Sequence, residues 1–206
     1  MLKLTKNNMR FFLITTFLIL SFQSLAKAGD IRDIQIEGIS VGDNLLNHLD
    51  VLNKTEIQIK EKKLTYYPKS KRLAISNYYD GNFEIYESVQ FTLDPNNFKI
   101  FRISGKIYNL NKDECTKKQK VIITELEKQF PNTIKDIDDF TKHPADKSGK
   151  SLANGIYLDF ASRDAISVEC YFWSETFKKE KNYEDHISVS IETKESRDFI
   201  DNEAYN

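Results

Sequence analysis

The chain has 206 residues, of which 30 are basic, 31 are acidic and 40% are hydrophobic. Its formal net charge of −1 lacks the excess of lysine and arginine with which proteins neutralise nucleic acid phosphates. One long apolar segment occurs, at residues 11–22. We therefore expect no nucleic acid partner, and no stable membrane insertion once this segment is removed.

The first 28 residues have the pattern of a secretory signal peptide. Three basic residues precede the apolar segment: Lys3, Lys6 and Arg10. An A-x-A pattern ending at Ala28 predicts cleavage before Gly29, and an uncleaved N-terminal anchor is the alternative. Cleavage removes four basic and no acidic side chains, which leaves 26 basic against 31 acidic residues and a net charge of −5. We expect a soluble protein, periplasmic or secreted.

Residues 29–110 and 111–206 are predicted to be two halves that share one core and repeat one plan, a helix followed by an antiparallel meander. In the first half we expect a strand at 34–39, short helices after Asp43 and Thr55, and strands at 71–79, 83–93 and 98–108. In the second half we expect a helix at 114–130, strands at 156–160, 165–173 and from His186, and a helix at 197–204. The predicted fold class is α+β, with the helices packed on one face of the sheet.

One catalytic pattern lies in the first half. Gly38 to Gly42 match G-x-S-x-G between a predicted strand and a predicted helix, which is the setting of a nucleophile elbow around Ser40. The polar stretch 132–154 shows no periodicity and is predicted to be a long surface loop that carries His143. A hydrolase with Ser40 as nucleophile and His143 as base is therefore one hypothesis, and a plain strand-to-helix turn is the favoured one.

Three tyrosines are candidates for an interface. Tyr78 and Tyr79 precede the hairpin turn Asp80-Gly81, and Tyr86 alternates with apolar residues on the next strand. Exposed tyrosines are enriched in protein interfaces, although ordinary strand preference explains the same residues.

The two cysteines, Cys115 and Cys170, are expected to form a structural disulfide, as a lone pair does in an oxidising compartment. The spacing of Cys115 places it on the apolar face of its helix, and Cys170 shares the apolar face of its strand. A redox-active pair is the alternative, although such pairs usually occur as C-x-x-C.

Metal and cofactor sites are not predicted. The acidic cluster Asp136, Asp138 and Asp139 lacks the turn glycine and distal glutamate of a calcium loop. The histidines do not have a second His or Cys at metal-ligand spacing.

Two stretches of the sequence resemble those of known proteins. Residues 34–43 with Leu45 and Leu46 are the first, and residues 103–105 followed by 113–115 are the second. They resemble a group of small, uncharacterised exported proteins of Pelagibacter-type marine bacteria, and this resemblance supports the pairing of Cys115 with Cys170. The turn at 34–43 is also similar to that of helix-pair-plus-meander modules, such as the lipoprotein of outer-membrane barrel assembly and the β-lactamase inhibitory protein, which would imply protein binding.

These observations predict an exported binding or protein-interaction module without catalytic activity. Its expected partner is another envelope protein, contacted through the tyrosines of the first half. The small periplasmic hydrolase built on Ser40 and His143 is the alternative.

Overall fold

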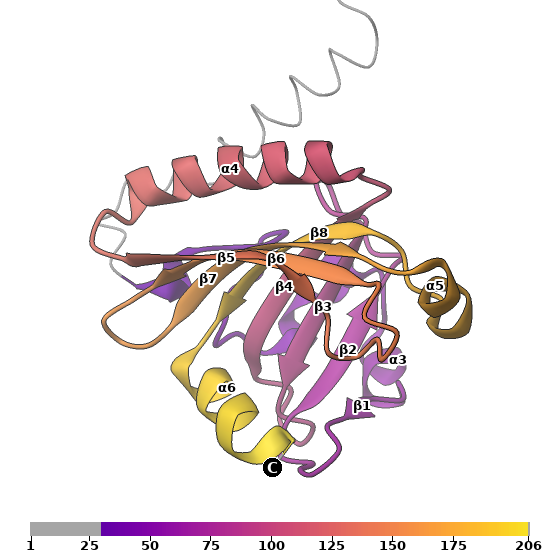
Figure 1. The fold of residues 1–206 in the computed structure, drawn as a ribbon. Coiled ribbons are helices and arrows are strands. Elements are labelled where there is room, and N and C mark those ends of the chain that lie inside the picture. Colours follow the sequence, from indigo (N-terminus) through magenta and orange to yellow (C-terminus); the bar gives the residue numbers. More distant parts are fainter. Residues whose placement is uncertain (1–29, 206) are drawn as a thin grey trace, which may run out of the picture.

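One antiparallel sheet of eight strands organises the part of the chain that the structure describes, residues 30–205. In this computed structural model the strands follow the order β1-β2-β3-β4-β8-β7-β6-β5 (Figure 1). The strands are β1 (Thr65–Tyr66), β2 (Ala74–Tyr78), β3 (Ser88–Leu93), β4 (Ile100–Tyr108), β5 (Ile134–Lys142), β6 (Leu152–Asp159), β7 (Ala165–Phe172) and β8 (His186–Glu192). The predicted signal peptide, residues 1–28, lies outside the described residues.

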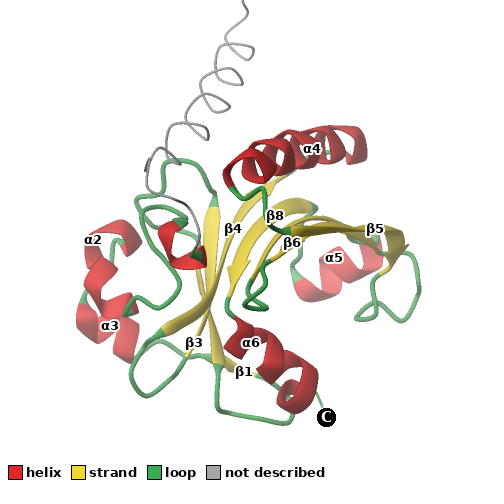
Figure 2. Ribbon diagram, turned by 90° about the vertical axis from the view of Figure 1, so that its left-hand side faces the viewer, coloured by secondary structure: helices red, strands yellow, loops and turns green. Residues whose placement is uncertain are grey.

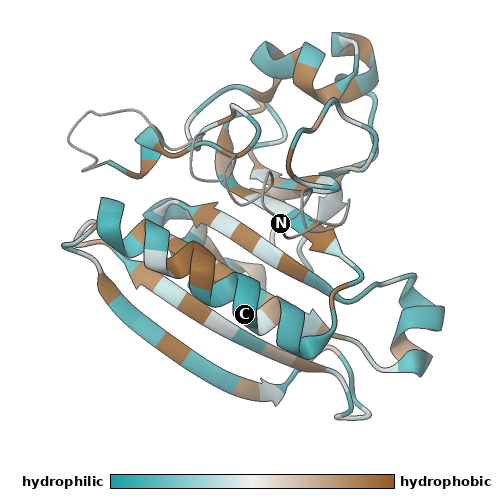
Figure 3. Ribbon diagram, turned by 90° about the horizontal axis from the view of Figure 1, so that it is seen from above, coloured by the Kyte–Doolittle hydropathy of each residue, from teal (hydrophilic) through white to brown (hydrophobic). Residues whose placement is uncertain are grey.

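Each half of the chain supplies four neighbouring strands, β1–β4 and β5–β8. The two sets meet where β4 pairs with β8, from Arg102 opposite Glu192 to Tyr108 opposite His186. The sheet is therefore continuous across the junction. Apolar and polar residues alternate along its strands (Figure 3), so each strand presents one row of side chains to each face.

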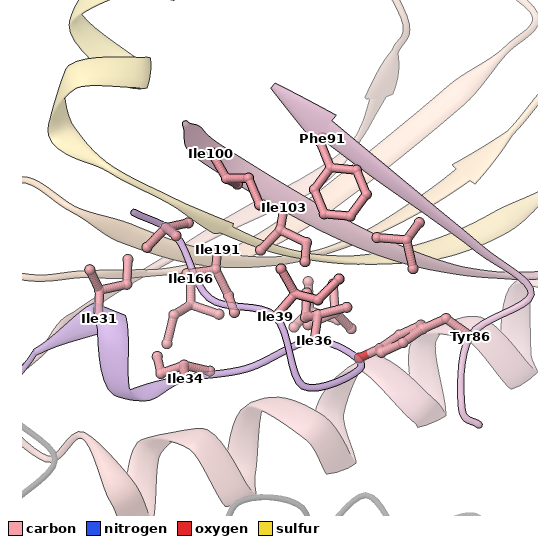
Figure 4. Close-up of a cluster of buried hydrophobic side chains, with 14 of the residues drawn as sticks. Ile31, Ile34, Ile36, Ile39, Tyr86, Phe91, Ile100, Ile103, Ile166 and Ile191 are labelled. Atoms are coloured by element: carbon pink, nitrogen blue, oxygen red, sulfur yellow. The ribbon is translucent and has the colours of Figure 1, made fainter. Parts of the chain in front are cut away.

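The core face of the sheet is the side that carries Phe91, Ile103 and Ile191. An irregular N-terminal segment crosses this face and packs a row of isoleucines against it (Figure 4). The segment contributes Ile31, Ile34, Ile36 and Ile39, all buried. These side chains, with those of the helices on the same side, form the main hydrophobic core.

Helices lie on both faces of the bent sheet (Figure 2). The core face carries the first three helices, with Leu52 of α2, Ile59 of α3 and Leu126 of α4 in the main core. The helices are α2 (Leu49–Leu52), α3 (Glu56–Lys60), α4 (Lys112–Gln129), α5 (Glu175–Lys181) and α6 (Lys194–Phe199), with a π-helical turn at Ile200–Ala204. Within residues 30–205, no helix combines the length and apolar character needed to cross a membrane.

The prediction that all helices pack on one face is wrong for α6. Phe199 packs with Leu73 and Phe101 in a small second cluster on the opposite face. The reason is a β-bulge: Leu93 pairs with Ile100 and Thr92 with Arg102, so the extra residue Phe101 turns away from the core face. This apolar ring gives α6 a surface to cover.

α4 and its disulfide agree with the sequence prediction. Asn111 and Glu114 form a capping box at the start of the helix, and the helix ends at Gln129, shortly before Pro131. Cys115 on its buried face is joined to Cys170 of β7, with 6.1 Å between the Cα atoms. The bond fixes the helix to the sheet.

Two strand predictions need correction. The stretch 132–154 is not a long loop, because it contains β5 and the start of β6, and only residues 143–151 connect them. β5 is an edge strand with most of both faces exposed, so its sequence has no need of apolar alternation. β3 begins at Ser88 rather than at residue 83, because the backbone N–H groups of residues 84–86 donate to the carboxylate of Glu37 instead of to a strand.

Candidate functional site

The opposite side of the sheet, here called the cleft face, carries polar side chains along its two central strands. β4 presents Arg102, Ser104, Lys106 and Tyr108 to this face. β8 presents His186, Ser188, Ser190 and Glu192, each opposite a polar partner on β4. Polar rows on central strands indicate a face that hydrophobic packing does not fill.

A cleft of about 560 Å³ opens over this polar face. Small serine side chains at positions 104 and 188 line its floor, flanked by Gln90 and Asn77 of the neighbouring strands. Its walls come from the β5–β6 loop through His143, from the α5–β8 connection through Tyr183, and from Tyr205. Figure 2 shows α5 and α6 on the side of the sheet opposite to α4.

Arg102 and two glutamates form a charged cluster at one end of the cleft. The guanidinium of Arg102 lies 3.6 Å from Glu169 and 3.7 Å from Glu192. Glu169 also accepts hydrogen bonds from the hydroxyls of Tyr171 (2.9 Å) and Ser167 (3.0 Å). Both carboxylates are therefore engaged, whereas Nε of Arg102 is buried and has no partner among the described residues.

Lys106 contributes a positive charge of a different kind. No hydrogen bond or ion pair joins its Nζ to any residue within 30–205. Burial, and then the nearby guanidinium of Arg102, lower the pKa of Lys106 to about 8, against the attraction of Glu169. The cleft thus holds an amine that forms no ion pair with any of the residues 30–205.

Four stacked rings form one wall of the cleft region. His186, Tyr171, Trp173 and Phe177 follow one another with centroid separations of 4.8, 5.8 and 5.2 Å. Because the neighbouring rings cover one another's faces, the stack offers edges rather than faces to a ligand. The indole N–H of Trp173 is buried in this region and has no hydrogen-bond partner among the described residues.

His186 has a defined tautomer. Its Nδ1 lies 2.8 Å from the backbone carbonyl of Glu184, and because a carbonyl only accepts, Nδ1 carries the proton. Burial, and then the charge of Lys106, lower the pKa of His186 to about 4. At neutral pH the ring is uncharged and its Nε2 is a lone-pair acceptor.

The β5–β6 loop that carries His143 is held by Asp146. This carboxylate accepts from the hydroxyls of Ser151 (2.5 Å) and Ser174 (2.8 Å), and these bonds keep the pKa of Asp146 well below its ordinary value. The loop thereby places the ring of His143 at 4.6 Å from that of Trp173. Burial lowers the pKa of His143.

The structure does not bring Ser40 and His143 together. Ser40 lies in the N-terminal segment on the core face, only 7% exposed, and its hydroxyl donates to the carbonyl of Ile34. His143 lies on the cleft face, across the sheet. Gly38 and Gly42 have positive φ angles of 75° and 94°, so the glycines of the motif form a tight turn.

Of the three predicted interface tyrosines, only Tyr79 is exposed, at 67%, and it lines the cleft. The expected exposure is wrong for Tyr78 (2%) and Tyr86 (6%), which belong to the main core. Because residues 84–86 are bound to Glu37 rather than paired in a strand, the ring of Tyr86 folds over Gly105, where a Cβ would come within 2.5 Å of it.

The sequence predicts the disulfide, and it singles out His143, which lines the cleft, but it does not single out Arg102 or Lys106. A signal for both exists, because they alternate with Ile103, Gly105 and Ile107 as polar residues of a strand. The same alternation is present in the sequence from His186 to Glu192. The sequence pattern does not show that β4 and β8 are neighbours in the sheet. This pairing brings their two polar rows together.

Comparisons with known proteins identify no relative of this chain. No protein-family model matches the chain, and no curated protein or solved structure matches it. The resemblance to exported proteins of Pelagibacter-type bacteria therefore stays a prediction. Within residues 30–205, no group of three or more His, Cys, Asp or Glu side chains is placed to hold a metal ion.

Proposed function

We propose that this is a non-catalytic binding protein that holds a small organic anion in the cleft over β4 and β8. The observation that carries the proposal is the amine of Lys106, which lies in the cleft without a counter-ion among the described residues. An unpaired cation removed from water is costly, and a bound anion would compensate it.

The charges around Lys106 support an anion rather than a cation. Glu169 and Glu192 lie beside Arg102, and both are engaged by its guanidinium and by hydroxyl groups. The carboxylate that lines the cleft itself, Glu184, is exposed to solvent. Two further donors, Nε of Arg102 and Nε1 of Trp173, lack acceptors among the described residues. A ligand rich in acceptor atoms would satisfy donors of this kind.

The dimensions of the cleft support a small ligand. Its volume of about 560 Å³ falls within the usual range of small-molecule sites, roughly 300–1,000 Å³. The serine floor leaves room and offers hydroxyl groups. Since Tyr79 is the one exposed member of the predicted tyrosine interface and lines the same cleft, we favour a small molecule over an envelope protein as the partner.

The position of the cleft supports the predicted repeat of the two halves. In each half, helices on the core face precede four strands, and the last strand of each, β4 or β8, lies at the centre of the sheet. We infer that the halves repeat one plan and that the ligand binds at their junction.

The compartment that we propose is the periplasm or the cell exterior. The disulfide between Cys115 and Cys170 is of the kind that forms and persists in oxidising compartments. The signal-peptide pattern of residues 1–28 is a second, separate reason to propose export. Catalysis by Ser40 is not favoured, because its hydroxyl is buried and bonded to a backbone carbonyl.

Isothermal titration of the purified protein tests the proposal, with pyruvate, benzoate and phosphate as probes. We expect at least one probe to bind, and Lys106→Met to weaken that binding by about tenfold or more, as loss of a charge-assisted hydrogen bond implies. Lys106→Arg keeps the charge and should retain most of the affinity. Lys117→Met, an exposed lysine of α4 on the other side of the sheet, is the matched control.

Two results would contradict the proposal. The first is the absence of binding by all three probes. The second is equal affinity of the wild type and Lys106→Met for every probe that binds.

A further inference from the structure

Lys106 places a primary amine where a ligand can reach it from the cleft. Its neighbours across the strands on the same face are Ser88 of β3 and Ser188 of β8. These short side chains leave the amine uncovered, and within residues 30–205 Nζ has no hydrogen bond or ion pair. The amine is therefore available for chemistry as well as for charge pairing.

The surroundings of Lys106 favour a nucleophilic amine. A lysine that is desolvated beside a second cation loses its proton more readily, which is one of the ways in which proteins activate amines toward carbonyl groups. Both conditions hold, since the side chain is half-buried and the guanidinium of Arg102 lies on the same strand face. With its pKa lowered to about 8, half of the amine is uncharged at pH 8.

His186 supplies a proton acceptor next to this amine. Tyr108, two residues from Lys106, pairs with His186, so the histidine is the diagonal neighbour of Lys106, within reach of long side chains. Because the carbonyl of Glu184 holds the proton on Nδ1, Nε2 keeps its lone pair. The other charged groups of the floor that face the amine are Arg102 and Glu169.

We propose that Lys106 binds its ligand covalently as an imine, which makes the ligand a small aldehyde or ketone acid. This inference rests on the proposed function and specifies the ligand class. The lone pair of Nζ forms a bond to the carbonyl carbon, and Nε2 of His186 passes a proton from the nitrogen to the oxygen, giving a carbinolamine. Loss of that oxygen and the remaining amine proton as water gives the imine. One amine and one carbonyl yield one imine and one water, so no oxidant or reductant is consumed.

Reductive trapping tests the imine. The purified protein is incubated with glyoxylate and sodium cyanoborohydride, which converts an imine into a stable carboxymethyl amine, and the adduct is located by peptide mass spectrometry. At pH 8 an amine with a pKa of about 8 has on the order of 100-fold more uncharged form than an ordinary lysine. We therefore expect Lys106 to be labelled at least about tenfold faster than any other lysine, with a half-maximal rate near pH 8.

The control variant separates this inference from the proposed function. Lys106→Arg should lose the fast adduct but still bind benzoate, which has no aldehyde or ketone. Labelling of Lys106 no faster than other lysines would overturn the imine, while a loss of benzoate binding in Lys106→Met would leave the binding function standing. Failure of both labelling and binding would overturn both.

Discussion

The two faces of the sheet are built from the same strands but differ in what covers them. On the core face, Phe91 and Ile103 are fully buried beneath the N-terminal segment and the main core. On the cleft face, the adjacent residues Gln90 and Ser104 line a cleft, and α6 covers only the small cluster around Phe101. One face of this sheet is therefore packed with apolar side chains, whereas the other carries a polar cleft, which we propose binds a ligand.

The largest effect is expected on the core face. Phe91→Ala should lower the free energy of unfolding by roughly 4 kcal/mol, because it removes a fully buried ring and leaves a cavity. Gln90→Ala, its neighbour on the cleft face, should cost about 1 kcal/mol through loss of its hydrogen bond to Asn77. Urea denaturation of both variants measures the difference. Equal losses would contradict the division between the faces.

The disulfide should have the next largest effect. The bond joins residues at a sequence separation of 55, and the double variant Cys115→Ala/Cys170→Ala should lose about 4 kcal/mol of stability by the chain-entropy model. The wild type in the presence of reductant should show a similar loss. The two thiols lie on the core face, so benzoate binding by the folded double variant should stay within about twofold of the wild type.

The cleft face should carry a pH dependence. Burial lowers the folded-state pKa of His186 to about 4, whereas an unfolded histidine titrates near 6.5. Between these values the unfolded chain binds more protons than the folded chain, so stability falls as the pH falls from about 6.5 to about 4. The loss from this group should reach roughly 2–3 kcal/mol. Urea denaturation between pH 7.5 and pH 4.5 should show a shallower decline for His186→Gln, and identical slopes would refute this assignment.

Much of the core face could be predicted from the sequence. The spacing of Cys115 and Leu126 defines one apolar helix face, and Cys170 alternates with Ile166 and Val168 on one strand face, so the disulfide could be anticipated. Local periodicity is enough for such elements, because each buries one continuous stripe of side chains.

The cleft face could be predicted only in part. The polar alternation from His186 to Glu192 was evident, but the sequence does not reveal that β8 lies beside β4, and Lys106 gains its role from that pairing. β5 was missed because an edge strand exposed on both sides has no apolar period. Tyr86 was misplaced because a long-range contact, the carboxylate of Glu37, breaks the strand before Ser88.

NMR can locate a bound anion on one face of the sheet or the other. Pyruvate is titrated into ¹⁵N-labelled protein, and amide shifts are followed residue by residue. We expect saturable shifts concentrated in β4 and β8 around Lys106 and Ser188, no shifts in α4, and loss of the shifts in Lys106→Met. Shifts concentrated elsewhere, or shifts that persist unchanged in Lys106→Met, would contradict the proposal.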